Sequence, residues 1–430
     1  MKKLLIAATV VLVSSSPLVL LPMEKELTLT PKQVQKLTQN TTASLTQFKQ
    51  VPKNPRTITT ILTYKNKDLT EFKTSIQADT KLSISAIFWN AKGEPVFQLQ
   101  DGDYVAASQK SIIDDSIYNQ KTVDMTFWTK DGLTVYKEPY VLGTEKADSK
   151  LASFKPIKVS QAAQTHAGTY YFVDGEGWIN ASDLSTTDNR IEAVQKVLNE
   201  KYNNQERISV YVKQLDTDRV AAINDEKSMY AASVAKLGVL YYAQERLSQK
   251  KLSLSDEYQY TSAVNGFPGA YDPDGSGKIS KMPDDKNYSL ENLLKAVAQN
   301  SDNVATNILG YYVTNQYDKA FQKSVDKAAA TSWNMDKKEL TARAAGTLME
   351  AVYRQNGDII NYLSSTDYDG ERISKNIDVP VAHKIGDAYD FKHDVAIVYA
   401  DSPFILSIFT DKEGYDKITS IADDVYGILK

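Results

Sequence analysis

The arrangement of apolar and polar residues divides the chain into a β-rich first part and a mixed second part. Strand-like runs occur at 58–64, 82–89 and 123–128, and each is rich in β-branched and aromatic residues. From residue 188 the periodicity becomes helical: Ile191, Val194, Val197 and Leu198 share one face of a predicted helix over 188–202, which Asp188 can cap. The pattern therefore predicts small all-β modules followed by an α+β domain.

Two segments of the first part repeat one hairpin pattern. Residues 97–108 and 171–182 both read aromatic residue, alternating apolar residues, Asp-Gly turn, aromatic residue and x-Ala-Ser. An Asp-Gly pair between alternating apolar residues is typical of a β-hairpin. The distance between the two copies indicates a duplicated module and not a solenoid. We place the modules at 23–116, with its linker, and 117–186.

The second copy ends in Gly175-Glu-Gly-Trp178-Ile179 and resembles the Src-homology-3-like, GW-type modules of bacterial surface proteins. In those families the modules dock on cell-wall polymers, so the resemblance implies peptidoglycan or another wall polymer as partner. Tyr104 and Trp178 equally fit core positions of the hairpins, because half-buried aromatic residues are common in small barrels.

The domain at 187–430 has strand patterns near both of its ends and helical patterns between them. The strand patterns cover 208–212, 220–223, 379–385, 395–399 and 404–409, and a last helix covers about 415–429. The simplest assembly is a five-stranded antiparallel sheet with flanking terminal helices and a helical insert over about 231–362.

The N-terminal segment, 1–22, indicates export. Two lysines after Met1 precede an uncharged, mostly apolar run over 4–22, which is typical of a signal peptide or a membrane anchor. Pro17 and Pro22 weaken a single straight spanning helix, and both cleavage and anchoring stay open. No other run approaches the length of about 18 apolar residues that indicates a spanning helix. We therefore expect the rest of the chain outside the membrane, at the cell surface or cell wall.

The amino-acid composition excludes several kinds of catalytic and binding site. The chain has no cysteine, which excludes disulfides, a thiol nucleophile and thiolate zinc sites, and its three histidines leave little for a transition-metal site. Asp272-Pro-Asp274-Gly-Ser-Gly277 starts like a calcium loop, but its twelfth position is Pro283 and not a bidentate Glu. The net charge is −4 and no basic stripe is present, so nucleic acid is excluded. We expect a monomer without cofactor or metal.

The first of three candidate motifs is Ser233-Val-Ala-Lys236, at the start of an apolar helix. Residues i and i+3 share a helical face, so the lysine amine can approach the serine hydroxyl. A partly desolvated lysine with a lowered pKa can remove the proton of a serine and make it nucleophilic. Backbone N–H groups at the helix start can stabilise an oxyanion.

The second motif is Ser301-Asp302-Asn303, between predicted helices at 290–299 and 303–313. It fits a plain loop with Asp302 as N-cap. It also fits a site in which Ser301 passes a proton to a leaving group and Asn303 binds an amide.

The third motif is Lys384-Ile385-Gly386, preceded by His383 on a predicted strand. The lysine fits an edge strand, and it also fits a cation that binds a substrate carboxylate while Gly386 allows close backbone approach. His383 is either a structural strand residue or a base paired with a serine.

S-x-x-K at 233–236, followed by S-D-N at 301–303 and K-x-G at 384–386, resembles class A β-lactamases and penicillin-binding proteins in motif order and rough spacing. Flanking stretches such as Tyr230-Ala-Ala-Ser233 are also similar to that family. The resemblance covers 187–430 and implies the fold of the family. It also implies these roles: nucleophile Ser233, base Lys236, proton transfer Ser301, and substrate binding by Asn303, Lys384, Ile385 and Gly386.

Two departures from the family pattern bear on activity. Ile385 replaces the hydroxyl residue of K-T-G, which removes one hydrogen bond to a substrate carboxylate. No E-x-x-L-N loop is present: 304–340 contains one Glu, Glu339, which we expect at the start of the following helix. Without a positioned base, an acyl-enzyme hydrolyses slowly, so we expect weak or no β-lactam turnover.

The sequence therefore predicts an exported, wall-associated serine acyl-transfer hydrolase that acts on an amide or ester of the envelope, with a β-lactam as a second ligand. Two alternatives stay open. One is a genuine class A β-lactamase. The other is a non-catalytic surface protein whose hydrolase fold is a scaffold, and the two missing residues favour it whereas the retained motif residues oppose it.

Overall fold

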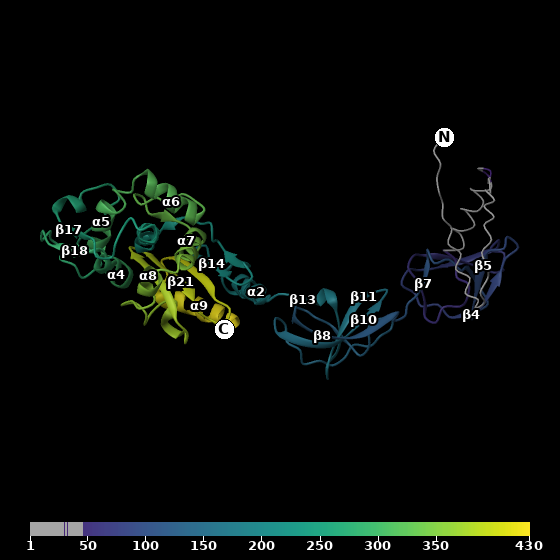
Figure 1. Ribbon diagram of the computed structural model, residues 1–430. Helices are drawn as coiled ribbons and strands as arrows, with labels where there is room; N and C mark the ends of the chain where they lie inside the picture. Colours follow the sequence, from purple (N-terminus) through teal and green to yellow (C-terminus); the bar gives the residue numbers. More distant parts are fainter. Residues whose placement is uncertain (1–29, 31, 33–45) are drawn as a thin grey trace, which may run out of the picture. The chain divides into compact units, whose positions relative to one another are not determined.

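The computed structural model describes residues 30, 32 and 46–430, and the chain divides into one unit that ends at Ser116 and one that begins at Ile117 (Figure 1). The predicted export segment at 1–22 lies outside the described residues. No helix in the described part of the chain is long and apolar enough to cross a bilayer.

An antiparallel sheet of order β3-β2-β6-β5-β4 forms the first unit. Its strands are β2 (Ile61–Tyr64), β3 (Phe72–Ile76), β4 (Ile84–Trp89), β5 (Pro95–Leu99) and β6 (Tyr104–Ala106), and β1 (Pro55–Thr57) pairs separately with β7 (Ile112–Asp114). Phe97, Val105 and Ile112 are fully buried and form the centre of its core.

The second unit begins with a six-stranded sheet of order β13-β8-β10-β11-β12-β9. Its strands are β8 (Asn119–Thr129), β9 (Val135–Tyr136), β10 (Pro156–Thr165), β11 (Gly168–Val173), β12 (Gly177–Asn180) and β13 (Leu184–Ser185), with a short turn η1 (Ala181–Asp183). Phe127, Val159 and Ile179 lie in its core.

Both predicted hairpins are confirmed. β5 pairs with β6 around Asp101-Gly102, and β11 pairs with β12 around Asp174-Gly175. The glycines have φ values of +90° and +79°, which L-residues rarely adopt. The core alternative holds for Trp178, which is 5% exposed and packs on Phe172 with ring centroids 5.2 Å apart.

The predicted five-stranded antiparallel sheet of the last domain is also confirmed, with order β15-β14-β22-β21-β20. Its strands are β14 (Ile208–Gln214), β15 (Val220–Ile223), β20 (Val381–Ala388), β21 (Phe391–Val398) and β22 (Phe404–Asp411). Strands from both ends of the domain therefore meet in one sheet, and every pairing is antiparallel.

Two helical layers cover this sheet. Successive side chains of a strand point to opposite faces, so Leu406 and Ile408 of β22 pack with α2 (Arg190–Tyr202) and α9 (Tyr415–Leu429). Ile405 and Phe409 of β22 belong to the core of the helical insert. The architecture is the predicted α+β fold, a five-stranded antiparallel sheet with flanking terminal helices and a helical insert.

The helical insert begins where the candidate motifs begin. Its elements are η2 (Ala232–Lys236), α3 (Leu237–Ser248), η3 (Ser262–Asn265), α4 (Leu290–Asn300), α5 (Asn303–Tyr312), α6 (Lys319–Ala329), α7 (Ala342–Gln355) and α8 (Asp358–Leu363), followed by η4 (Ser374–Asn376). Two short ribbons complete it: β16 (Met229–Tyr230) with β19 (Glu339–Leu340), and β17 (Glu257–Gln259) with β18 (Asn287–Ser289). The side chains of Ser289, Asp302, Asp318 and Thr341 each accept first-turn N–H groups, which explains four of the helix starts.

Two local predictions need correction. The helix predicted from Asp188 begins two residues later, at Arg190, with Asn189 in the N-cap position; the Asp188 carboxylate lies before it and accepts from the backbone N–H and the guanidinium of Arg190. Glu339 does not lie in a first helical turn: it pairs with Tyr230 in the β16–β19 ribbon, and Thr341 caps the helix that follows.

Candidate active site

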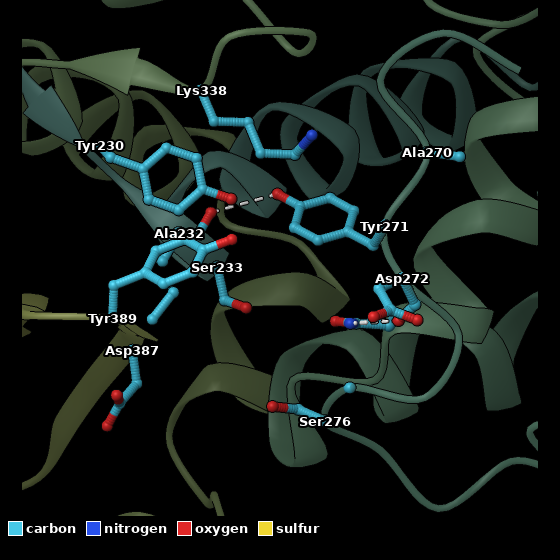
Figure 2. Close-up of a pocket in the computed structure, with 13 residues that line it drawn as sticks. Tyr230, Ala232, Ser233, Ala270, Tyr271, Asp272, Ser276, Lys338, Asp387 and Tyr389 are labelled. Atoms are coloured by element: carbon cyan, nitrogen blue, oxygen red, sulfur yellow. Dashed lines mark hydrogen bonds between the residues drawn. The ribbon is translucent and has the colours of Figure 1, made fainter.

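A cavity of about 240 Å³ opens beside Ser233 (Figure 2). Its walls come from segments far apart in the sequence and include Tyr230, Ser233, Tyr271, Asn303, Lys338 and Tyr389. Two of the predicted site residues, Ser233 and Asn303, therefore line the cavity. The others, Lys236, Ser301, Lys384, Ile385 and Gly386, do not.

Ser233 sits on a strained turn that presents its hydroxyl to the cavity. Ala232, directly before it, has a φ of +49°, a sparsely populated conformation for a residue with a Cβ. The turn is held by Tyr271 Oη, which donates to the carbonyl of Ala232 at 3.2 Å, and by Lys338 O, which accepts from Ala231 N at 2.7 Å. None of the hydrogen bonds within the described part of the chain uses Ser233 Oγ, so this hydroxyl is available to a ligand.

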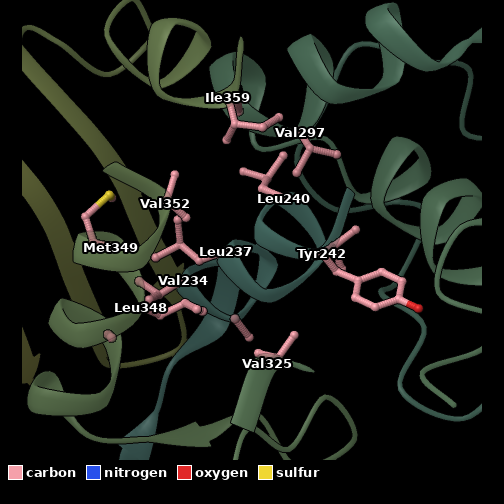
Figure 3. Packing of buried hydrophobic residues seen from close by; sticks show 14 of the residues in the cluster. Val234, Leu237, Leu240, Tyr242, Val297, Val325, Leu348, Met349, Val352 and Ile359 are labelled. Carbon is pink, nitrogen blue, oxygen red and sulfur yellow. The ribbon is translucent and has the colours of Figure 1, made fainter. Parts of the chain in front are cut away.

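The helix behind Ser233 is fixed in the core of the insert (Figure 3). Leu237, Leu240 and Val297 are fully buried there. A Cβ at Gly238 would lie 2.6 Å from Nε1 of Trp333, and this indole donates to the carbonyl of Ala235 at 3.1 Å. Such close packing holds the turn that carries Ser233 and the base of the Lys236 side chain.

Lys236 is fully buried and binds the S-D-N turn. Its Nζ lies 2.6 Å from the carbonyl oxygen of Ser301 and 2.6 Å from Oδ1 of Asn303, with Ser301 Oγ further away at 3.5 Å. Burial lowers the pKa of Lys236 well below its ordinary value, and the charge of Lys384 lowers the pKa further, whereas Asp302 opposes both effects. Burial therefore shifts the Lys236 amine toward its neutral form.

The S-D-N turn is shaped by its central aspartate. Ser301 has a φ of +53° and ends α4, while Asp302 caps α5 by accepting from Ala305 N at 2.9 Å. The same carboxylate accepts from the backbone N–H groups of Lys278 and Ile279. The predicted N-cap is thus confirmed, and the turn directs the Ser301 carbonyl and the Asn303 amide toward Lys236.

Lys384 reaches Ser301 from the sheet. Its Nζ donates to Ser301 Oγ at 2.8 Å and to the carbonyl oxygen of Ile385 at 3.0 Å, and the residue is 1% exposed. Burial lowers the pKa of Lys384 to about 7, with Asp394 acting in the opposite direction. A Cβ at Gly386 would lie 2.6 Å from the carbonyl oxygen of Ala231, so this glycine allows β20 to pack against the Ser233 turn.

Two histidines near the site have structural partners. His383 lies between Asp394 and Asp369, at 3.0 and 3.1 Å, and although burial acts to lower its pKa, the two carboxylates raise the pKa to about 9. His393 accepts from Thr410 N through Nδ1 and therefore donates through Nε2 to the carbonyl of Tyr230, and burial lowers its pKa to about 4. His383 thus holds sheet and loop together and is not paired with a serine.

Sequence reasoning misses several cavity residues. Tyr389, which is 85% exposed, has a φ of +54° at the β20–β21 turn, and its ring centroid lies 5.9 Å from that of Tyr230. Both tyrosines lie close to a motif in the sequence, which could have identified them. Tyr271 and Lys338 carry no such signal, because only the tertiary fold brings them beside Ser233.

No metal centre is indicated in the described part of the chain, where no group of three or more His, Asp or Glu side chains is placed to hold an ion. The calcium-like loop is an ordinary turn: Asp272 Oδ1 accepts from Asp274 N at 3.0 Å. The groups around Ser233 that can take part in chemistry are its hydroxyl, the amide of Asn303 and three lysine amines, Lys236, Lys338 and Lys384, whose pKa is lowered by burial.

Three solved structures illustrate what the chain is similar to. PBP-A is 15% identical with a TM-score of 0.46, over 56% of this chain and 95% of its own. A β-lactamase from Sphaerobacter thermophilus is 15% identical with a TM-score of 0.44, over 56% and 94%. The extended-spectrum β-lactamase TLA-3 is 17% identical with a TM-score of 0.46, over 56% and 99%. At these TM-scores the likenesses carry no inference, and a search of curated proteins finds no match.

Two family models match the sequence. Residues 48–112 match a domain of unknown function, DUF5776, and the Src-homology-3-like, GW-type assignment of the β modules is not confirmed. Residues 189–429, more than half of the chain and the whole domain that contains Ser233, match the β-lactamase enzyme family. The protein therefore belongs to the β-lactamase enzyme family.

Proposed function

We propose that this protein is an exported, cell-wall-associated serine hydrolase that transfers an acyl group from an envelope amide or ester to Ser233. The observation that carries the proposal is the environment of the Lys236 amine. A neutral amine has two N–H groups and one lone pair. The two short contacts, to Ser301 O and Asn303 Oδ1, can take both N–H groups, which leaves the lone pair to accept a proton. The described contacts do not join Lys236 Nζ to Ser233 Oγ, and the approach of these two atoms is part of the proposal.

Acylation then follows from these contacts. Lys236 takes the proton of Ser233 as Oγ forms a bond with the substrate carbonyl carbon. The bond from that carbon to the leaving nitrogen or oxygen breaks, and the leaving atom takes a proton from Ser301. Lys384 donates to Ser301 Oγ at 2.8 Å and can resupply this proton.

Slow deacylation is part of the proposal. The acidic residues of the cavity wall are Asp272 and Asp387, and the latter is occupied by Arg372, Lys392 and Tyr415. Glu339 is exposed on β19 and does not line the cavity. Asp272 is exposed and binds the backbone N–H of Asp274 within its own turn, so neither carboxylate is held toward Ser233 by a contact of the described chain. We therefore expect weak or no β-lactam turnover.

Wall association rests on residues outside the catalytic domain. The segment at 1–22 has the pattern of an export signal or anchor, and two β modules precede the family domain. We propose that these modules bind peptidoglycan or another wall polymer. Sedimentation of the full chain with purified walls, compared with a chain that lacks 46–116, tests this role: equal sedimentation of both would remove the first module from it.

Covalent labelling tests the activity. A fluorophosphonate or fluorescent penicillin should add one adduct to the intact chain, located on Ser233 by mass spectrometry, and Ser233→Ala should abolish it. Ser276→Ala is the matched control, because Ser276 lines the same cavity and its side chain makes none of the contacts to Lys236.

The outcomes separate the alternatives. No adduct on Ser233 with either reagent would contradict the proposal and favour a scaffold role for the fold. Rapid turnover of a chromogenic cephalosporin that is lost in Ser233→Ala would instead identify a genuine β-lactamase.

A further inference from the structure

Lys338 is a buried cation on the wall of the cavity (Figure 2). The residue is 6% exposed, and its Nζ donates to the carbonyl of Gly269 at 3.0 Å. It also lies 4.5 Å from the ring centroid of Tyr271, the tyrosine that holds the Ser233 turn. No acidic side chain in the described part of the chain forms an ion pair with Lys338.

A lysine in this position is costly unless something complements it. Buried charges in proteins are normally paired, because removal of an ammonium from water is expensive. The Gly269 carbonyl and the Tyr271 ring satisfy part of the ammonium, and burial still lowers the pKa of Lys338. The remaining N–H donor can be satisfied by a ligand in the cavity, and an anion complements it best.

The opposite wall of the cavity offers no lysine amine that could bind an anionic group of a ligand. Lys384 Nζ is occupied by Ser301 Oγ and Ile385 O, and Lys384 does not line the cavity. The acidic residues that line the cavity are Asp272, which is exposed, and Asp387. Burial acts to raise the pKa of Asp387, but hydrogen bonds from Lys392 and Tyr415 outweigh it and hold the carboxyl in its ionised form.

We propose that Lys338 binds a carboxylate of the substrate, so that the enzyme prefers acyl donors with an anionic group directed away from the Lys384 strand. The inference rests on the proposed acylation of Ser233 and specifies its substrate class. Lys338 is the cation among the residues that line the cavity, and the carboxylates of Asp387 and Asp272 line other parts of it, so Lys338 is the group that can select such a substrate.

Three para-nitrophenyl esters of matched length test the preference: the adipate monoester is anionic, the hexanoate is neutral and the trimethylammoniohexanoate is cationic. The full chain should acylate fastest with the adipate, by roughly 10- to 100-fold over the hexanoate, the range expected for one charge-assisted hydrogen bond. The readout is kcat/KM from nitrophenolate release, after subtraction of the spontaneous rate.

Two variants attribute the preference to one side chain. Lys338→Met should abolish the preference, so that the ratio of the adipate rate to the hexanoate rate falls to about 1 in the variant. Lys337→Met removes the same charge from the neighbouring exposed residue, which does not line the cavity, and should keep the full preference.

Each result has one meaning. A wild-type chain that reacts fastest with the neutral or cationic ester would overturn the role of Lys338, even if Lys338→Met fails to fold. Equal loss of both rates in a folded Lys338→Met chain would do the same. If none of the esters acylates Ser233 in the wild-type chain, the proposed function itself fails.

Discussion

The β modules and the β-lactamase-family domain bury polar groups in different ways. In the modules the buried groups include hydroxyls such as those of Thr57 and Thr129, each of which donates to a backbone carbonyl at 2.7 Å. In the family domain three lysines, Lys236, Lys338 and Lys384, are at most 6% exposed. None of the three forms an ion pair with a carboxylate of the described chain, and their amines bind carbonyl, amide and hydroxyl oxygens instead.

We interpret this difference as one between buried polar groups that stabilise the fold and buried polar groups that serve the proposed reaction. A hydroxyl bonded to a backbone carbonyl costs little to bury, whereas an ammonium without a counter-charge costs several kcal/mol. All three lysines lie around the Ser233 turn, where neutral amines and proton donors are useful. Substitutions of these lysines should therefore affect activity and stability in opposite directions.

The largest expected effect is at Lys236. Lys236→Met should slow acylation of Ser233 by roughly 100- to 10,000-fold, the usual contribution of a general base, while it raises the melting temperature. Melting is followed by calorimetry and acylation by the rate of fluorophosphonate labelling.

Lys213 provides the contrast within the same domain. Its Nζ binds the buried Glu350 carboxylate at 2.9 Å, and Arg354 binds the same carboxylate. Lys213→Met removes one of these two cations and should lower the melting temperature without a change in labelling. If Lys236→Met were destabilising and still active, the distinction between the two kinds of burial would be wrong.

The next effect concerns the pH dependence of stability, to which two neighbouring residues of β20, His383 and Lys384, should contribute with opposite signs. The pKa of His383 is raised from 6.5 to about 9 by Asp394 and Asp369, against the effect of burial. Its contribution to stability is complete below pH 6.5 and is lost as the pH rises through 9. His383→Gln should therefore cost about 3 kcal/mol in acid, since Asp394 becomes unpaired, and little above pH 9.

Lys384 should show the reverse. Burial lowers its pKa to about 7, so the unfolded chain binds the lysine proton more tightly and folding is penalised below pH 7. The penalty disappears as the pH rises toward 10.5, and Lys384→Met should be more stable than the wild type in acid but not in base. Calorimetry across this range checks both variants, and parallel pH slopes for the two would contradict the assignment.

The sequence was sufficient for the architecture because the patterns involved are local. Strand runs near both ends of the family domain predicted the five-stranded sheet, and the Asp-Gly pairs predicted both hairpins. The errors, at Asp188 and Glu339, concern which neighbour a carboxylate binds. Such choices depend on partners such as the Arg190 guanidinium, which no periodicity reveals.

The candidate site was predictable only in part. The three motifs predicted that Lys236, Ser301, Asn303 and Lys384 belong together, and the contacts among them agree, although their catalytic roles stay predictions. Lys338 lies in a loop next to another lysine, Lys337, and nothing in the sequence distinguishes the two. Only the fold buries one of them against Tyr271 and exposes the other.

The smallest expected effect concerns the first module, and it tests whether the stability of that module is independent of the reactivity of Ser233. Gly102 has a φ of +90° and open space around its Cα, so Gly102→Ala should cost about 1 kcal/mol through backbone conformation alone. Gly102→Asn should cost less, because asparagine tolerates positive φ. Calorimetry of the full chain measures both losses.

Ser233 labelling should stay at the wild-type rate in both variants, because the module contributes no residue to the cavity. A labelling rate that fell with the stability of this hairpin would mean that the module and the site are energetically coupled. Buried polar groups in the module could then not be assigned to fold stability alone, nor those at the site to the reaction alone.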